Sequence, residues 1–521
     1  MRTGRRTSGL SRSLLLAFGL GVILLAISWI PLPGQSADGK LSVQAWGHRY
    51  DDRDPRIAVD WNGNSYVVWE RYTPDQIDDV DVYWRHVSPD GTLGAVLNLA
   101  DGPDVDNGLN EYRPRIDLDP AGNSYVVWYG QTTSPGGEFG TPWVDPDFEI
   151  FLQRVATDGA TLGTPLRLTD NDRDDLSPEI AVDDLGNWSA VVWRGWTAYD
   201  WDLYWQGLSL MGTPTVIASS PRNITSNGRD DRHPGIGVDP NGDTYVAWES
   251  QRYIGRGDYE IYWQTINING MRVAGSTNLS QSPGQDDAPQ IAVDEVRGNS
   301  FIVWQGRNGS QWDIYWRMVG PGGTPVVNQC FIGSQWDLVL PLCNLTSDYT
   351  TGMRFSESFP QVALDANGNS YVVWEGHDYR DTDIYWRRIS QDGSATGVLV
   401  LSDYPGHYYE NDHAPQIAVD GEGNSYVVWQ GSDGYEAEIY WRRVNADGTL
   451  SPVVQITDNR RHPDRVPVIG INQDGNSKVA YQGWDGISWA VWWRQVSDVA
   501  TMSATVAVYP TPTPTPVPWI P

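Results

Sequence analysis

Apolar and polar positions alternate along the chain in short runs, and one pattern of such runs is repeated eight times. The clearest copy is Pro415–Trp429, with the sequence PQIAVDGEGNSYVVW. Its first proline recurs at Pro55, Pro114, Pro178, Pro234, Pro289, Pro360 and Pro467, at intervals of 52 to 71 residues. No repeat shows the 3.6-residue apolar period of an amphipathic helix, and short apolar runs bounded by turn residues indicate strands.

Each repeat is predicted to contain four strands. In the first repeat they are Arg56–Asp60, Ser65–Trp69, Val80–Val87 and Ala95–Leu99. Four strands in each of eight repeats predict an all-β fold, an eight-bladed β-propeller of four-stranded blades. The second run, SYVVW, is apolar on both faces, which is typical of a strand buried between two neighbouring blades.

The turn between the first two strands reads D-x-x-G-N and carries a glycine in all eight repeats. A tight hairpin turn needs a positive φ at one position, and glycine adopts it without steric cost. The preceding acid, as in Asp60, Asp119 and Asp183, can accept hydrogen bonds from N–H groups of the turn. We therefore expect these acids to be structural.

Two sets of aromatic residues recur at fixed positions. One ends the second strand, at Trp69, Trp128, Trp193, Trp248, Trp304, Trp374, Trp429 and Tyr481. The other lies in the third strand, at Trp84, Trp205, Trp263, Trp316, Trp386, Trp441 and Trp493, with Leu152 in the second repeat. We predict that these rings pack between blades and are not platforms for sugars.

The two ends of the repeat region predict how the ring closes. The last repeat has three clear strands, and the segment that precedes the first repeat resembles the fourth strand and exit loop Val453–Pro467. Leu41–Trp46 is therefore predicted to complete the last blade, which would leave the ring without a free edge. The competing segment is Ala504–Tyr509. The propeller is expected to span residues 38–499.

The segments outside the repeats predict export. Four arginines precede Leu14–Ile30, an apolar run of 17 residues, so residues 1–37 are either a signal peptide cleaved near Ala37 or a membrane anchor. Either alternative makes the protein secreted or cell-surface, outside the cytoplasm. Residues 500–521 include PTPTPTPVPWIP and are predicted to be a Pro/Thr-rich linker or tail.

The net charge argues against one class of partner, and the two cysteines predict a disulfide. The net charge of −30 opposes a nucleic-acid partner, whose phosphates require Lys and Arg. The only two cysteines, Cys330 and Cys343, lie in one insertion. In an oxidising compartment they are expected to form a disulfide, and the alternative is two buried thiols.

Acidic residues recur at two further positions. An acid lies three residues before every repeated proline: Asp52, Glu111, Asp175, Asp231, Asp286, Glu357, Asp412 and Asp464. A second set opens the third strand: Asp81, Glu149, Asp202, Glu260, Asp313, Asp383 and Glu438. Both sets are expected at loops of one face, as two rings around the central opening. Carboxylates suit calcium, so a metal at one or a few blades is one hypothesis, and structural bonds that hold blade to blade are the other.

Loops that differ between repeats are the better candidates for a binding site. The loop after Trp128 is the longest of its class, with an interval of 21 residues from Trp128 to Glu149, and it falls on the acidic face. Its candidate ligand-binding residues are Glu138, Phe139, Trp143, Asp145, Asp147 and Phe148, joined by Asp101, Asp104 and Asp106 of the connection before the second repeat.

Catalytic signatures are weak in this sequence. It contains no G-x-S-x-G, H-E-x-x-H or P-loop motif, and its seven histidines share no spacing between repeats. Arg56 and Arg115 follow repeated prolines and are candidates to face the channel, but two arginines do not make the cluster of a sialidase-like enzyme.

The repeats resemble those of bacterial extracytoplasmic β-propeller proteins with sialidase-like, Asp-box or TolB-type repeats. The resemblance rests on PxIAVDxxGNSYVVW followed by DIYWRRV and DGT, and covers Leu41 to about Val496. The turn Ser88-Pro89-Asp90-Gly91-Thr92 lacks the second half of an Asp-box, so the match concerns fold more than function. We expect a binding or scaffold module for an extracellular glycan, peptide or protein. The alternative is a sialidase-like, glycan-processing hydrolase.

Overall fold

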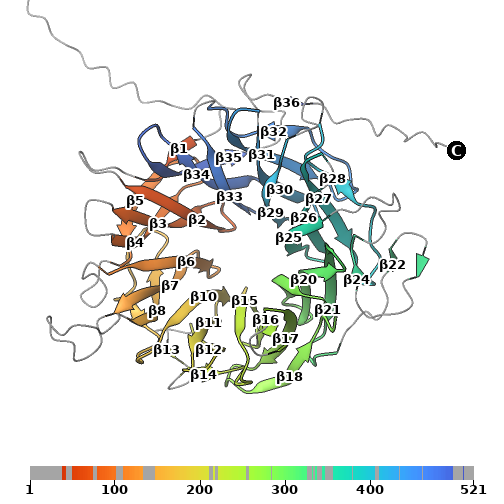
Figure 1. Ribbon diagram of the computed structural model, residues 1–521. Coiled ribbons are helices and arrows are strands. Elements are labelled where there is room, and N and C mark those ends of the chain that lie inside the picture. Colours follow the sequence, from red (N-terminus) through yellow and green to blue (C-terminus); the bar gives the residue numbers. More distant parts are fainter. Residues whose placement is uncertain are drawn as a thin grey trace, which may run out of the picture.

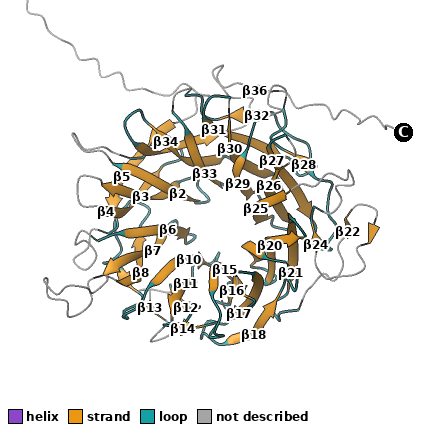
Figure 2. Cartoon of the chain, viewed as in Figure 1, coloured by secondary structure: helices purple, strands orange, loops and turns teal. Residues whose placement is uncertain are grey.

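The computed structural model shows a ring of β-sheets around a central opening (Figure 1). It describes residues 38–42, 50–73, 79–100, 109–132, 147–210, 215–216, 221–253, 257–282, 284–324, 331–332, 335–336, 343–346, 356–377, 380–404, 410–432, 434–459, 462–496 and 508–509. No helix occurs in these ranges, and none is therefore long and apolar enough to cross a membrane (Figure 2). The predicted signal or anchor, the loop 133–146 and Cys330 lie outside the described residues.

The sheets form eight antiparallel blades, as predicted, each with its first strand nearest the opening (Figure 1). Blade 1 contains β2 (Asp51–Val59), β3 (Ser65–Thr73), β4 (Asp79–Val87) and β5 (Leu93–Asn98), and blade 2 contains β6 (Glu111–Leu118), β7 (Ser124–Thr132), β8 (Asp147–Val155) and β9 (Leu166–Arg167). Blade 3 contains β10 (Asp175–Val182), β11 (Trp188–Trp196), β12 (Trp201–Ser209), β13 (Thr215–Val216) and β14 (Arg222–Asn223). Blade 4 contains β15 (Asp231–Val238), β16 (Thr244–Gln251), β17 (Tyr259–Ile266) and β18 (Arg272–Asn278). Blade 5 contains β19 (Asp286–Asp294), β20 (Asn299–Asn308), β21 (Gln311–Val319) and β24 (Cys343–Asn344), and blade 6 contains β25 (Ser356–Leu364), β26 (Ser370–His377), β27 (Thr382–Ile389) and β28 (Leu399–Val400). Blade 7 contains β29 (His413–Val419), β30 (Ser425–Ser432), β31 (Ala437–Val444), β32 (Val453–Gln455) and β36 (Val508–Tyr509). Blade 8 contains β33 (Asp464–Ile471), β34 (Ser477–Trp484), β35 (Trp489–Val496) and β1 (Asp38–Lys40). A separate hairpin joins β22 (Phe331–Ile332) to β23 (Gln335–Trp336).

The N-terminal segment closes the ring, as expected, but the predicted strand was misplaced. The strand is β1, which pairs Gly39 with Trp493 of β35. Only Leu41 of the predicted Leu41–Trp46 follows on, with its N–H bonded to Val491 O at 2.9 Å, and residues 43–49 lie outside the described residues. The competing C-terminal segment contributes β36, which pairs with β32 at the outer edge of blade 7.

The repeated tryptophans of the third strands join neighbouring blades. In six blades the indole N–H donates to a Ser or Thr hydroxyl that opens the second strand of the next blade, at 3.0 to 3.1 Å: Trp84 to Ser124, Trp205 to Thr244, Trp316 to Ser370, Trp386 to Ser425, Trp441 to Ser477 and Trp493 to Ser65. In blade 2, Leu152 offers no donor, and the buried Ser189 hydroxyl of blade 3 bonds no described group. The rings therefore pack between blades, as predicted.

A strained bulge occurs near the start of every first strand. The residue before each repeated proline has a positive φ although none is glycine: Asp54, Arg113, Ser177, His233, Ala288, Phe359, Ala414 and Val466, with φ of 49 to 54°. A side chain in this region of backbone space costs about 1 kcal/mol or more and needs support from its surroundings. At Arg113, Ala288, Phe359 and Ala414 the N–H of the bulge donates to a Glu or Gln side chain of the preceding blade at 2.7 to 2.9 Å.

The hairpin-turn acids are structural, as expected. Asp60 accepts the N–H and the side-chain amide of Asn64 at 2.8 and 2.7 Å, and it also accepts the Tyr66 hydroxyl at 3.2 Å. The glycine of this turn, Gly63, has a φ of 85°, which explains why glycine is needed there.

Candidate anion-binding site at the channel mouth

The predicted loop sector is described only in part. Asp147 is buried and accepts the Thr132 hydroxyl at 2.6 Å, so it has a structural role. Phe148 packs in an aromatic cluster, with ring centroids 5.4 Å from Tyr129 and 6.2 Å from Tyr112. Glu138, Phe139, Trp143, Asp145, Asp101, Asp104 and Asp106 lie outside the described residues.

The acids three residues before the prolines are buried inside the blades and do not form an exposed ring. Six of them accept the indole N–H that ends the second strand of the same blade, at 2.5 to 3.2 Å: Asp52 from Trp69, Asp175 from Trp193, Asp231 from Trp248, Asp286 from Trp304, Glu357 from Trp374 and Asp412 from Trp429. Glu111 and Asp464 are also buried. These hydrogen bonds lie within single blades, whereas the structural hypothesis drawn from the sequence placed them between blades. Calcium binding by this set stays a prediction.

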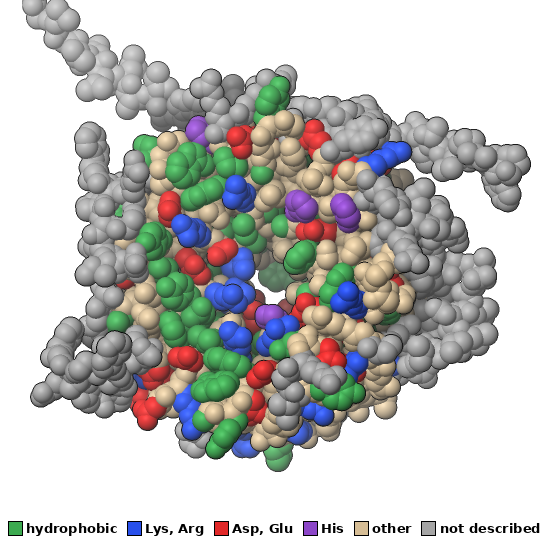
Figure 3. Space-filling view, in the orientation of Figure 1, with side chains coloured by type: hydrophobic (Ala, Val, Ile, Leu, Met, Phe, Trp, Pro, Cys, Tyr) green, Lys and Arg blue, Asp and Glu red, His purple; other side chains and the backbone are tan. Residues whose placement is uncertain are grey.

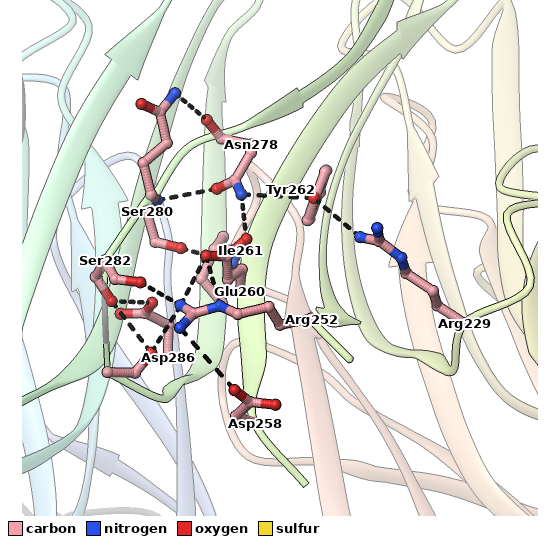
Figure 4. Close-up of polar contacts among 12 residues, drawn as sticks. Arg229, Arg252, Asp258, Glu260, Ile261, Tyr262, Asn278, Ser280, Ser282 and Asp286 are labelled. Atoms are coloured by element: carbon pink, nitrogen blue, oxygen red, sulfur yellow. Dashed lines mark hydrogen bonds and ion pairs between the residues drawn. The ribbon is translucent and has the colours of Figure 1, made fainter. Parts of the chain in front are cut away.

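Two of the acids that open the third strands, Glu260 and Glu149, are also held by hydrogen bonds. Figure 4 shows Glu260 held by Arg252 of the same blade, with Nη2 and Oε1 2.7 Å apart. Glu149 receives Arg167 at 2.9 Å and the N–H of Asn171 at 2.7 Å. These carboxylates therefore position loops of the face on which the first strands begin, which we call the upper face.

Arginines gather beside the central opening. Figure 3 shows Lys and Arg side chains along one side of this opening, over the blades that contain β2, β6 and β10. Arg56 and Arg115, the two arginines singled out from the sequence, lie in β2 and β6. Burial and then the charge of Arg115 lower the pKa of Arg56 to about 10. Arg115 is bonded to Glu179 of blade 3 at 2.8 Å.

Two further arginines complete this group, and sequence reasoning missed both. Arg113 is the exposed bulge residue of blade 2, with its N–H bonded to Glu70 at 2.7 Å. Arg194 follows the second-strand tryptophan of blade 3, and its Nε is buried without a hydrogen-bond partner among the described residues. Burial and then the charge of Arg113 lower the pKa of Arg194. We call Arg56, Arg113, Arg115 and Arg194 the arginine cluster.

A mixed cluster of charged groups adjoins it in blades 4 and 5. Atoms of His233, Glu249 and Asp287 lie within 4.8 Å of one another. Glu249 also accepts Arg232 Nε at 2.6 Å and the N–H of Ala288 at 2.9 Å. Its oxygens are thus already bonded to a cation and an amide, which fits a hydrogen-bonded cluster better than an ion site.

Burial and the bond to Glu249 set the protonation of this cluster. Burial and then the interaction with Glu249 raise the pKa of Asp287 to about 7. Burial opposes the charge of Glu249, but bonds from His233 and Asp287 and the charge of Arg232 outweigh it and lower the pKa of Glu249. The two carboxyl groups therefore differ in protonation below neutral pH.

Aromatic rings accompany arginines at three blades of the upper face. The guanidinium carbons of Arg194, Arg232 and Arg465 lie 4.7, 3.6 and 4.9 Å from the ring centroids of Trp201, Tyr259 and Trp489, in blades 3, 4 and 8. Two tryptophan pairs, Trp196 with Trp201 and Trp484 with Trp489, have centroids 5.3 and 5.6 Å apart. Trp196, Trp201 and Tyr259 belong to the adjacent blades 3 and 4, and we call them the aromatic arc, whereas the rings of blade 8 lie across the opening from blade 4 (Figure 1). Flat rings beside guanidinium groups are suited to bind a sugar ring and an acidic substituent together.

One signal in the sequence would have revealed the missed residues. The bulge position and the position after the second-strand aromatic both vary among repeats, and Arg113 and Arg194 occupy them in adjacent blades. Alignment on the repeated proline and on the second-strand tryptophan shows this variation, whereas loop length does not.

The comparisons with known proteins concern the fold. Neither a family model nor a curated protein matches the sequence. The chain is similar to an ulvan lyase bound to -[GlcA(1-4)Rha3S]- (11% identity over 88% of this chain and 98% of that chain, TM-score 0.42). It is similar to Trypanosoma rangeli sialidase in complex with sialic acid (8%, 89% and 59%, TM-score 0.38) and to endo-arabinase from Bacteroides thetaiotaomicron VPI-5482 (15%, 53% and 96%, TM-score 0.28). At these identities and TM-scores, none of the three similarities assigns an activity to this chain.

Proposed function

We propose that this protein is a binding module for acidic glycans, with the carboxylate or sulfate of a sugar held by the arginine cluster. The observation that carries the proposal is the gathering of Arg and Lys side chains beside the opening over blades 1 to 3, where Arg113 is exposed (Figure 3). Guanidinium groups so close together repel one another, and charge-assisted bonds to an anionic ligand would offset this repulsion. The chain has a net charge of −30, so a local group of four arginines forms a positively charged region on an acidic protein and favours an anionic ligand.

The aromatic arc supports a glycan over a small inorganic anion. Rings in the adjacent blades 3 and 4 lie beside arginines on the same face. Sugars present apolar C–H faces, which pack on aromatic rings, and hydroxyl groups, which bond to polar neighbours. The proposal includes the predicted export of the chain, because an exported protein would meet acidic polysaccharides at the cell surface.

Affinity electrophoresis tests the proposal with the full chain. At least one of the gels containing polygalacturonate, hyaluronate or heparin should retard the protein, and gels containing neutral xyloglucan should not. Arg113→Ala and Arg194→Ala should abolish the retardation. Arg297, paired with Asp294 at a first-hairpin turn on the opposite face, provides the matched control Arg297→Ala, which should behave as wild type. Equal mobility in all gels would contradict the proposal.

A glycan-processing hydrolase is the second candidate, and one observation favours it. Asp287 and Glu249 are neighbouring carboxyl groups with pKa values shifted in opposite directions, an arrangement that suits an acid and a base. His233, with Nδ1 3.0 Å from Glu249, is exposed beside them. Turnover of fluorogenic sialosides or uronides, lost in Asp287→Asn, would establish this activity, and stable substrates would exclude it for those linkages.

A further inference from the structure

A cavity of about 380 Å³ lies where the chain passes from blade 2 into blade 3. It is lined by Asp170, Asp172 and Asp175, together with Trp196 and Tyr204, and the one arginine of its lining, Arg173, donates to the Thr197 carbonyl at 2.7 Å. Its volume is within the range of ~300–1,000 Å³ that is usual for ligand pockets. None of the residues proposed from the sequence, apart from the buried Asp175, contributes to it.

The cavity has a chemistry opposite to that of the arginine cluster. Asp170 and Asp172 are exposed, and Asp170 accepts Arg167 at 2.9 Å. Asp175 is buried and receives the side-chain amide of Asn171 at 2.6 Å, so it holds the wall in place. Carboxylates repel an anion and accept hydrogen bonds from hydroxyl groups. The partly exposed indole of Trp196 adds an apolar surface, so the cavity suits an uncharged, hydroxyl-rich ring.

The cavity and the arginine cluster are joined through one aromatic pair. Arg194 and Trp196 are two residues apart in β11, so their side chains leave the same face of the strand. Trp201 is the cross-strand partner of Trp196, with ring centroids 5.3 Å apart, and the Arg194 guanidinium lies 4.7 Å from the Trp201 ring. Trp201 and then Trp196 therefore lead from Arg194 to the edge of the cavity at the end of β11, while the cavity's other rings, Trp193 and Tyr204, lie on the opposite face of the sheet.

We propose that the ligand is a heteroglycan that occupies two subsites, with an anionic residue on the arginine cluster and a neighbouring uncharged residue in the blade 3 cavity. This inference rests on the proposed function and adds the class of glycan to it. A homopolymer in which every residue is charged would place an anion against Asp170 and Asp172. A single sugar acid would leave the cavity unused.

Titration calorimetry with paired probes tests the inference on the full chain. The pairs are glucuronate with cellobiouronate, and N-acetylneuraminate with sialyllactose, in which the same acid is alone or linked to uncharged sugars. For a pair that binds, the extended member should bind at least tenfold more tightly than the free acid. Trp196→Ala should remove this gain, which is measured as the ratio of the two affinities within the same variant. Asp172→Asn, a surface substitution that should not affect folding, should reduce the gain, and Arg194→Ala should weaken both members.

The outcomes separate this inference from the proposed function. Equal affinity for the free acid and its extended form, or a gain that survives in both Trp196→Ala and Asp172→Asn, overturns the cavity subsite while acidic-glycan binding stands. If neither pair binds and the gels show no retardation by any acidic polymer, the proposed function fails and the inference fails with it. Retardation by a polymer while neither pair binds overturns the two-subsite assignment alone.

Discussion

The indole N–H of Trp429 donates a hydrogen bond of 2.9 Å to Asp412, a buried carboxyl group on the first strand of the same blade. The same pairing occurs at five other blades, where an acid three residues before the repeated proline receives the ring that ends the second strand. In these six blades the recurrence of the acid is thereby explained by the fold, because the indole donor is buried and needs an acceptor.

Removal of one such acceptor should destabilise the protein. Asp412→Ala leaves the Trp429 indole N–H unpaired in the interior, and we expect a loss of about 1–3 kcal/mol in the free energy of unfolding. Asp412→Asn keeps an oxygen acceptor at the same place and should cost clearly less. Chemical denaturation of both variants measures the difference. Equal losses would show that the carboxyl group does not act through this bond.

Stability should fall as the pH rises from about 4 to about 8. Burial raises the pKa of Asp231 and Asp286 to about 6, of Asp175 to about 7 and of Glu357 and Asp464 to about 8. In the unfolded chain these groups titrate near 4, so in this window the folded state binds more protons and loses stability as the pH increases. Thermal unfolding at pH 5 and pH 8.5 tests this, and Glu357→Gln should flatten the profile. Greater stability at pH 8.5 would contradict the assignment.

The bond between third-strand tryptophans and the next blade has an internal control. Ser425 accepts the Trp386 indole at 3.1 Å, so Ser425→Ala should cost about 1 kcal/mol. Ser189 occupies the same position beside blade 2, where Leu152 has no donor, and its hydroxyl bonds no described group. Ser189→Ala should therefore be neutral or slightly stabilising. A comparison of the two unfolding midpoints decides the matter, and similar losses would refute the proposed bond.

Glu70 should tune the affinity of the arginine cluster. Its carboxylate lies near Arg56 and Arg113 and accepts the N–H of the Arg113 bulge. Glu70→Gln retains an acceptor, as Gln305 does for Phe359 at the corresponding place, and removes a negative charge. We expect two- to tenfold tighter binding of acidic glycans at unchanged thermal stability. Weaker binding would indicate that Glu70 itself contacts the ligand.

The sequence alone predicted the ring, the blade number and the closing partner, because prolines, turn glycines and paired tryptophans recur at every blade. The register of the closing strand was misplaced by three residues. Gly39 and Val454 occupy equivalent places beside Trp493 and Trp441, but the connection from Gly39 to Pro55 is three residues longer than that from Val454 to Pro467. Alignment on the proline therefore shifted the strand.

The candidate site was much less predictable. A repeated acid suggested a ring of ligands, yet burial beside an indole makes Asp412 and its equivalents part of the blade. Arg113 and Arg194 looked like scattered variation until the fold brought neighbouring first and second strands together at one mouth of the channel. Proximity between adjacent blades depends on positions about 60 residues apart in sequence, and no local pattern encodes it.

Titration calorimetry of acidic oligosaccharides with the wild type and Arg194→Ala tests the central claim most directly. Oligogalacturonate and sialyllactose present carboxylates, a heparin-derived oligosaccharide adds sulfates, and cello-oligosaccharides of equal length serve as the uncharged control. The account predicts that at least one acidic series binds, that Arg194→Ala weakens it by tenfold to a hundredfold, as the loss of about 1.5–3 kcal/mol requires, and that the uncharged series does not bind. Unchanged affinity in Arg194→Ala, or equal binding of the uncharged series, would contradict it.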